Sequence, residues 1–414
     1  SLRAQENRIL EILREKIRYT PEQIELLEAR GGQDEREAHS VLGQSAAGGE
    51  VVVSGDAAVE SEVHAAINPL DTQNVIVSPI RQGTNLDCPI YYTTDFGSTW
   101  SRGQFQATPR VPGTTVLGGG DPVLAYDLNG RAFITWLSFE FGVGVINARM
   151  YWAYSDDRGA TWTRPDGDVV VEHTATLQGT GTIIDKQWMA TDASQSQWRG
   201  SLYAAFLETT GDESHIGLRY LRAGDILWSK TTITISDVDL FTVQFCDLVV
   251  DESGVIHVSY WGSPDGSNYA LYHAASSDGG ATFGASTMIS WAHMMNFTAG
   301  EDGSTIAGVD ARRIYPCPHI AVDNSGGAAS GNLYAVWTAQ GTTTKLANGL
   351  DIYFSRSSDG GSTWSSATIV NSDPPDRGTH QFYPSISVSP AGVIAVTWYD
   401  RPSDPSNRRT EDYL

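Results

Sequence analysis

One eight-residue pattern recurs four times and constrains the fold more than any other feature of the chain. The pattern is Ser/Thr-x-Asp-x-Gly-x-Thr-Trp/Phe, and we call its copies the Asp turns: Thr93–Trp100, Ser155–Trp162, Ser276–Phe283 and Ser357–Trp364. The aspartate can accept hydrogen bonds from nearby backbone amides, and the glycine allows a positive φ. Each copy therefore predicts a tight turn between two strands, and the repetition predicts a repeat architecture.

A second segment, a short apolar strand that ends in Asp, Asn or Ser, recurs six times. Its alternation of branched and small residues is typical of a strand that packs on both faces. Two more strands follow each copy, and the later one leads into an Asp turn in the first, second, fourth and fifth repeats. The six segments begin at Glu62, Asp121, Lys186, Phe245, Cys317 and Tyr383. Six repeats of about four strands predict an all-β fold, a six-bladed β-propeller.

The Asp turns resemble the Asp boxes of the sialidase-type (BNR repeat) β-propeller family, over residues 55–414. This resemblance implies that the Asp turns lie on one face of the propeller. It places any site on the opposite face, where loops enter the first strands and join the second strands to the third. The box residues would then be structural: Asp95, Trp100, Asp157, Trp162, Asp278, Phe283, Asp359 and Trp364.

The first 48 residues differ in kind from the rest. Residues 1–31 predict a helical hairpin, because apolar residues recur at helical spacing and Thr20-Pro21 can begin a second helix. Two short helices bury too little surface to be stable alone, so we expect them to pack on the propeller or to bind a partner protein. Residues 32–48 predict a linker and residues 49–414 the propeller, whose last blade is closed by a strand at 49–55 or truncated.

The chain is acidic, with a formal charge of −22 over 414 residues. Nucleic acids and anionic membranes require a basic surface, so the charge argues against both as partners. No apolar run of 18 residues is present to span a membrane. These features fit an extracellular or cell-surface protein. The three cysteines are too few for a disulfide framework, and a Cys246–Cys317 bridge or separate thiols both remain open.

If the resemblance extends to activity, it implies arginines that hold a substrate carboxylate, an acid that transfers a proton and a tyrosine nucleophile activated by a carboxylate. The candidate catalytic residues are Arg81, Arg312, Arg313 and Arg401 as arginines, Asp121 as acid, Tyr383 or Tyr315 as nucleophile and Glu208 as its partner. The Arg-Ile-Pro signature of sialidases is absent, and Glu62-Val63-His64 occupies its place. A non-catalytic binding role therefore stays open.

Further polar and aromatic residues fall on the same predicted face. Aromatic rings suit stacking against sugars, and a packed strand does not need polar residues at its third position. The candidate ligand-binding residues are His64, Lys186, Asp247, His319, His380, Tyr399 and Trp261. No cofactor is predicted. The acidic residues could bind calcium but lack the spacing of a calcium loop, and the His and Cys residues lack paired zinc spacing.

Three functions follow from these features. The first is a surface propeller that binds a glycan or a protein through the face opposite the Asp turns. The second is a glycoside hydrolase or polysaccharide lyase that acts on an acidic glycan. The third is a structural module of a larger surface assembly, docked by the N-terminal helices.

Overall fold

The computed structural model describes residues 51–55, 58–82, 86–107, 115–176, 180–211, 213–236, 240–265, 268–294, 306, 314–343, 349–372, 378–401 and 411–413. The predicted helical hairpin and linker, as well as Arg312 and Arg313, lie outside these residues. The described residues form strands and turns, and none of them lies in a helix that could cross a membrane.

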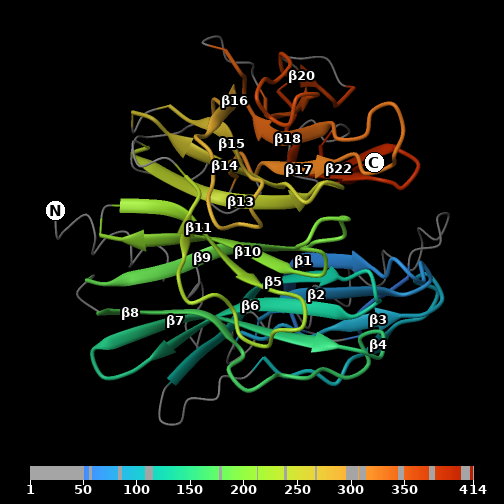
Figure 1. Cartoon of the computed structure of the whole chain (residues 1–414), viewed down its shortest axis with the longest axis vertical. Helices are drawn as coiled ribbons and strands as arrows, with labels where there is room; N and C mark the ends of the chain where they lie inside the picture. The colour runs from blue at the N-terminus through green and yellow to red at the C-terminus, as the bar shows by residue number, and fades with distance from the viewer. Residues whose placement is uncertain are drawn as a thin grey trace. The chain divides into compact units, whose positions relative to one another are not determined.

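The strands form six antiparallel sheets (Figure 1), in each of which neighbours in the sheet are neighbours in the chain. The first three sheets are β1 (Glu60–Ile67), β2 (Val75–Arg81), β3 (Tyr91–Thr93) and β4 (Ser101–Arg102); β5 (Thr115–Tyr126), β6 (Ala132–Phe141), β7 (Val145–Ser155) and β8 (Val169–Thr176); and β9 (Thr182–Thr191), β10 (Leu202–Thr210), β11 (Glu213–Leu221) and β12 (Ile233–Thr234). The other three are β13 (Thr242–Val250), β14 (Ile256–Ser263), β15 (Ala270–Ser276) and β16 (Thr287–Trp291); β17 (His319–Val322), β18 (Leu333–Ala339), β19 (Asp351–Ser357) and β20 (Thr368–Ile369); and β21 (Phe382–Val388), β22 (Ile394–Asp400) and β23 (Glu411–Tyr413).

This succession of four-stranded meanders confirms the prediction of an all-β propeller. The structure has five complete four-stranded blades rather than six, because the last sheet has three described strands. Residues 51–55 are not in a strand, so the predicted strand at 49–55 does not complete that sheet within the described residues.

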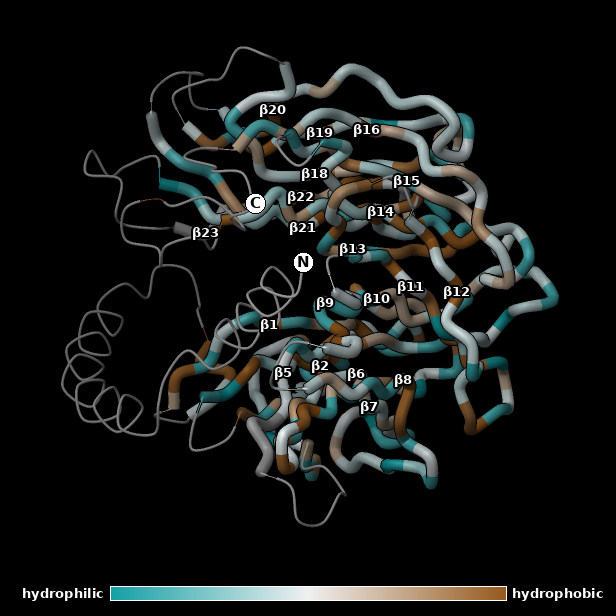
Figure 2. The backbone as a smooth tube through the Cα atoms, turned by 90° about the vertical axis from the view of Figure 1, so that its left-hand side faces the viewer, coloured by the Kyte–Doolittle hydropathy of each residue, from teal (hydrophilic) through white to brown (hydrophobic). Residues whose placement is uncertain are grey.

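The chain divides into two compact units. The first comprises Ser1–Asp185, Thr209–Asp212 and Gly224–Lys230, and the second comprises Lys186–Glu208, Glu213–Ala223 and Thr231–Leu414. Hydrophobic stretches of the chain recur along the strands (Figure 2). The buried hydrophobic side chains form clusters between successive sheets of one unit. Trp136 and Ile76 belong to such a cluster in the first unit, and Trp337 and Phe382 to one in the second.

Each repeated first strand ends in a residue whose side chain closes the next turn. The Oδ1 atom of Asp251, for example, accepts hydrogen bonds from the backbone amides of Ser253 at 2.9 Å and Val255 at 2.8 Å. Equivalent bonds to a backbone amide are made by Asn68, Asp127, Asp192, Asp323 and Ser389. This turn chemistry explains why the repeat ends in Asp, Asn or Ser.

The Asp turns join the third strand of a sheet to the strand that follows. In the last of them, Asp359 accepts bonds from the backbone N–H of Thr363 at 2.9 Å and from the Thr363 hydroxyl. The hydroxyl of Ser357 donates to Asp359 at 2.7 Å and accepts from the Gly361 amide at 2.9 Å. The bonds from Thr363, followed by that from Ser357, lower the pKa of Asp359 to about 2. These hydrogen bonds therefore favour the ionised form of Asp359, and in that form they stabilise the turn.

The glycine and the aromatic residue of an Asp turn face the preceding sheet. A Cβ atom on Gly361 would lie 2.0 Å from a carbon of the His273 ring, and one on Gly159 would lie 2.7 Å from Ile76. The ring of Trp364 packs against His273, with ring centres 5.7 Å apart. The third repeat lacks an Asp turn, and there Trp228 packs against Trp152 at 6.2 Å. The Asp turns that contain Gly159 and Gly361 thus close their own hairpins and also seal interfaces with the preceding sheets.

This geometry predicts unequal costs for alanine at two adjacent glycines. Gly360 and Gly361 both have positive φ, but a Cβ on Gly360 would meet nothing within 4 Å. Gly360→Ala should therefore cost about 1 kcal/mol from backbone strain alone. Gly361→Ala should cost several kcal/mol, roughly 3 or more, because the new methyl group overlaps the His273 ring. Urea denaturation of both variants measures the difference, and equal losses would contradict the proposed seal.

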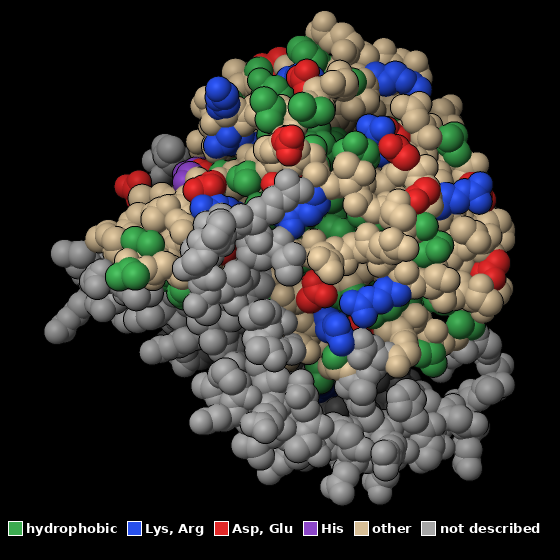
Figure 3. Space-filling view, turned by 90° about the horizontal axis from the view of Figure 1, so that it is seen from below, with side chains coloured by type: hydrophobic (Ala, Val, Ile, Leu, Met, Phe, Trp, Pro, Cys, Tyr) green, Lys and Arg blue, Asp and Glu red, His purple; other side chains and the backbone are tan. Residues whose placement is uncertain are grey.

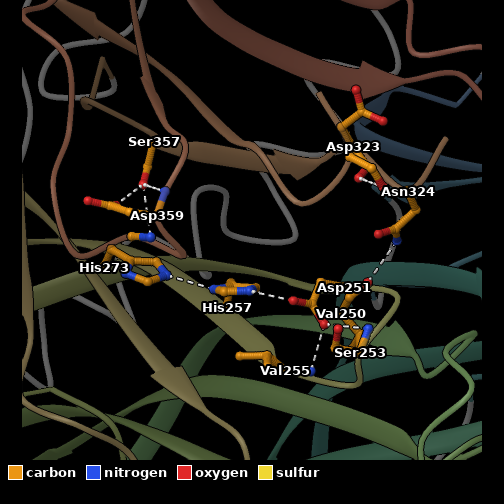
Figure 4. A network of polar contacts seen from close by, with 12 residues as sticks. Val250, Asp251, Ser253, Val255, His257, His273, Asp323, Asn324, Ser357 and Asp359 are labelled. Carbon is orange, nitrogen blue, oxygen red and sulfur yellow. Dashed lines mark hydrogen bonds and ion pairs between the residues drawn. The ribbon is translucent and has the colours of Figure 1, made fainter. Parts of the chain in front are cut away.

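The interface between the fourth and fifth sheets contains a buried chain of titratable side chains (Figure 4). Asp251 Oδ2 lies 3.5 Å from Nε2 of His257, and Nδ1 of His257 lies 3.0 Å from Nε2 of His273. Both imidazoles are almost fully buried. Burial, followed by repulsion from His257, lowers the pKa of His273 to about 3, although an interaction with the Gly361 backbone opposes this shift.

The low pKa of His273 predicts that the fold loses stability at pH values well above the pKa of a carboxylate. A histidine in the unfolded chain has a pKa of about 6.5. Below that pH the unfolded chain therefore binds a proton at His273 that the native protein does not bind. Stability should be complete above pH 6.5 and should fall as the pH decreases toward 3. Between pH 6.5 and 4.5 this one group should remove about 2 to 3 kcal/mol. Urea melts should show a smaller loss over that range for His273→Gln, and an equal loss would contradict the assignment.

Candidate functional site

The six repeated first strands share an unusual backbone conformation. The first residues of the six repeated segments all have left-handed φ, and none is glycine: Glu62 (52°), Asp121 (50°), Lys186 (48°), Phe245 (48°), Cys317 (41°) and Tyr383 (52°). The pairing register of the strand shifts at this point, for example between Gln244 and Asp247. Such bulges redirect side chains, and a left-handed residue other than glycine costs about 1 to 2 kcal/mol. The chain keeps a side chain at each of these strained positions.

We call the first and third residues of the six repeated segments, counted from the residue with left-handed φ, the inner-strand row. In the second unit the row consists of Lys186, Phe245, Cys317 and Tyr383 at first positions and Trp188, Asp247, His319 and Ser385 at third positions. In the first unit it consists of Glu62, Asp121, His64 and Val123. The row contains six of the predicted site residues, and it adds Trp188, which the sequence analysis did not select.

The first positions in the second unit combine a cation with aromatic rings. The ammonium group of Lys186 stands 5.1 Å from the centre of the Phe245 ring. That ring lies 4.7 Å from Tyr315 and is stacked at 6.4 Å on the buried Trp261. Lys186 and Phe245 are half-buried, so both keep some contact with solvent. This arrangement offers a positive charge beside an apolar ring face.

The third positions combine an acid, a base and an indole. Nδ1 of His319 lies 3.1 Å from Oδ2 of Asp247, and the same oxygen accepts the backbone N–H of Ile320 at 2.9 Å. The ring of Trp188 meets His319 edge to face at 5.0 Å. Asp247 is buried, whereas the His319 side chain is 21% exposed. The carboxylate therefore fixes the orientation of an imidazole that remains open to solvent.

His64 has a different role in the first unit. Its Nδ1 atom accepts the backbone N–H of Leu124 at 3.1 Å, so it connects the first strands of two adjacent sheets. Asp247 makes the corresponding bond to Ile320 in the second unit. A polar third position can thus serve to join neighbouring strands, which was the structural alternative to ligand binding.

The last sheet buries several residues that were predicted to be part of the open site. Arg401 is 1% exposed, and its guanidinium group lies 5.3 Å from the centre of the Phe382 ring. His380 is buried and accepts the Leu350 amide at 3.3 Å. Burial, together with the charge of Arg401, lowers the pKa of His380 to about 4. In contrast, Tyr399 is 44% exposed. An arginine that binds a substrate carboxylate must be accessible to the substrate, whereas Arg401 is buried.

The other predicted catalytic residues are divided between the two units. Glu208, in the second unit, is buried in its own sheet, 2.7 Å from Nε2 of His215 and 3.3 Å from the Thr232 hydroxyl. Arg81 and Asp121 belong to the first unit, where the Arg81 amide donates to the Asp87 carbonyl at 2.8 Å. The described hydrogen bonds of the Glu208 carboxylate are thus with His215 and Thr232, and its pairing with Tyr383 or Tyr315 stays a prediction.

One ionic cluster was missed by the sequence analysis. Glu140 is fully buried in the second sheet, where it pairs with Arg149 and accepts the Tyr151 hydroxyl at 2.8 Å. Arg149 also binds Glu172 at 2.8 Å. The available signal was the alternation along β7, which brings Arg149 and Tyr151 to one face of the hairpin. The cluster satisfies its own charges and stabilises the sheet.

Within the described part of the chain, no group of three His, Cys, Asp or Glu side chains is placed to hold a metal ion. No disulfide joins Cys88, Cys246 and Cys317, all of which are described. Cys246 donates to the Lys186 carbonyl at 3.4 Å, and its burial raises its pKa. The alternative left open by the sequence is therefore resolved in favour of separate thiols.

The strain in the row can be measured at Glu62, which is exposed and left-handed. Glycine within a strand usually costs about 0.5 to 1 kcal/mol, but at a left-handed residue it also removes the strain. Glu62→Gly should therefore be more stable than the matched variant Ala65→Gly, in the same strand, by about 1 to 2 kcal/mol. Thermal and urea melts test this order, and equal effects would show that position 62 is unstrained.

Comparison with known proteins gives a fold but no sequence family. No protein-family model matches the chain, and no curated protein matches it. The leech intramolecular trans-sialidase is similar in structure with a TM-score of 0.55 at 14% identity, over 91% of this chain and 72% of that one. A mutant α-L-arabinofuranosidase from Fusarium graminearum is similar with a TM-score of 0.54 at 12% identity, over 85% of this chain and 91% of that one.

The NanB sialidase from Streptococcus pneumoniae gives a TM-score of 0.52 at 11% identity, over 89% of this chain and 70% of that one. Likeness at such low identity establishes the fold alone. The chain has the β-propeller fold that occurs in these sialidases and arabinose-releasing enzymes.

Proposed function

We propose that the protein binds a glycan through the inner-strand row of its second unit. The observation that carries this proposal is the half-buried Lys186–Phe245 pair, backed by Tyr315 and Trp261. A sugar presents apolar C–H faces and polar hydroxyl edges. An aromatic ring can pack against the former, while the ammonium group and the Asp247–His319 pair can form hydrogen bonds with the latter.

The backbone supports this assignment. The six residues with left-handed φ recur at equivalent positions of the repeats, and strain that the surrounding structure maintains is frequent at binding sites. The similar structures include proteins whose names identify them as sialidases and arabinofuranosidases. Both kinds of enzyme act on sugars, which supports a carbohydrate ligand here.

Overall charge does not identify the ligand. Acidic and basic side chains are interspersed on the described part of the face seen in Figure 3, so that face does not present charge of a single sign. The buried position of Arg401 weighs against a clamp for a substrate carboxylate. We therefore favour binding of a glycan over sialidase action, with the protein located outside the cell or on its surface.

The architecture beyond the described residues is part of the same proposal. A fourth strand in the last sheet would make six blades within residues 49–414. Residues 1–31 would form a helical hairpin that packs on the propeller or binds a partner protein, and residues 32–48 would form the linker.

A glycan array with the full chain tests the binding function. Phe245→Ala and Lys186→Met should each weaken the strongest binding signal at least about tenfold, because each removes one partner of the cation–aromatic pair. Phe241→Ala provides the control, since Phe241 is 67% exposed and lies outside the row. A signal that all three variants retain would place binding elsewhere. Absence of any glycan signal from the folded wild type would favour the assembly function.

A further inference from the structure

The Asp247–His319 pair has the geometry of a proton-transfer site. Asp247 fixes Nδ1 of His319 at 3.1 Å, and the Ile320 amide fixes Asp247 at 2.9 Å. The other ring nitrogen, Nε2, has no hydrogen-bond partner among the described residues, and the side chain is 21% exposed. When Nδ1 donates its proton to Asp247, the lone pair of Nε2 is available to a molecule in the solvent.

The equivalent positions of the other repeats show whether the fold itself requires such a pair. The third positions of the six first strands hold His64, Val123, Trp188, Asp247, His319 and Ser385, although all six strands share one backbone form. The fold therefore does not require an acid next to a base at this position. Joining two strands needs only one acceptor, as His64 shows with Leu124. The imidazole of His319 is surplus to that structural requirement.

We propose that Asp247 and His319 form an acid–base pair that hydrolyses an ester bond on the carbohydrate bound by the row. The location of the substrate rests on the proposed glycan binding. Trp188, which packs against His319, borders the place where the acylated sugar lies. Lys186 provides the row in the second unit with its one permanent positive charge.

In the proposed step, Nε2 of His319 removes a proton from water as the water oxygen forms a bond to the ester carbonyl carbon. The carbonyl π electrons move onto oxygen, and the charge of Lys186 favours the resulting anion. This intermediate collapses, the bond to the sugar oxygen breaks, and that oxygen takes the proton back from Nε2. Asp247 stabilises the transient imidazolium and remains ionised. Water and ester become carboxylic acid and alcohol, with no other reactant.

The composition of the row favours an ester over a glycosidic bond. Glycoside hydrolysis commonly uses two carboxyl groups on opposite sides of the bond. In the second unit the row contains one, Asp247, and its Oδ2 atom is already bound by His319 and Ile320. Ester hydrolysis needs a single base that takes a proton and returns it, which one oriented imidazole can do.

Acetate release from O-acetylated xylo-oligosaccharides, together with cleavage of 4-nitrophenyl acetate, tests the inference with the full chain. His319→Gln and Asp247→Asn should each lower kcat/KM at least about 100-fold, the usual contribution of a positioned base. His215→Gln is the matched control, because His215 also pairs with a carboxylate of the second unit, Glu208, but lies outside the row. It should retain the wild-type rate.

The pH profile separates proton transfer from a structural effect. The wild-type rate should depend on pH, as a reaction that uses a general base does, and this dependence should vanish from the residual rate of His319→Gln.

If the wild type binds glycans but releases no acid from either ester, the acid–base inference is overturned and the binding function stands. Equal losses in His319→Gln and His215→Gln would also overturn it. If ester cleavage depends on His319 while the array shows no binding, the dyad stands and the proposed glycan site is rejected.

Discussion

The contact between the glycine of an Asp turn and the sheet before it is the interaction on which the described fold depends. Only scattered backbone hydrogen bonds join successive sheets among the described residues, such as that from the Gln104 amide to the Ala160 carbonyl at 2.7 Å, so packing must supply much of the cohesion between sheets. Gly361 brings its backbone against the His273 ring at a distance that no side chain would permit. Because the same residue also needs positive φ, one position satisfies both the turn and the interface.

This double role explains why the fold could be predicted so far from the sequence. Turn chemistry is local, and the Asp turns and the polar ends such as Asp251 recur with fixed spacing. The closure of the last sheet could not be predicted, because pairing between strands far apart in the sequence leaves little local signal.

The candidate site was predictable only in part. Aligning the repeats selected Lys186, Asp247 and His319 by their position, since equivalent residues of a repeat occupy equivalent places. The alignment could not reveal that Arg401 is buried against Phe382, because burial depends on the packing of the whole sheet. Trp188 was not selected, because a tryptophan in a strand is usually a core residue. Only the structure shows that its ring packs against His319.

The left-handed residues have a consequence for how this protein can change. The backbone at each of the six positions is bent by its surroundings, and residues as different as Glu62, Phe245 and Cys317 adopt nearly the same φ. The energetic penalty is thus almost independent of the side chain. Recognition at these positions can therefore diverge by single substitutions while the scaffold beneath them stays the same, so that one repeat unit can present several chemistries.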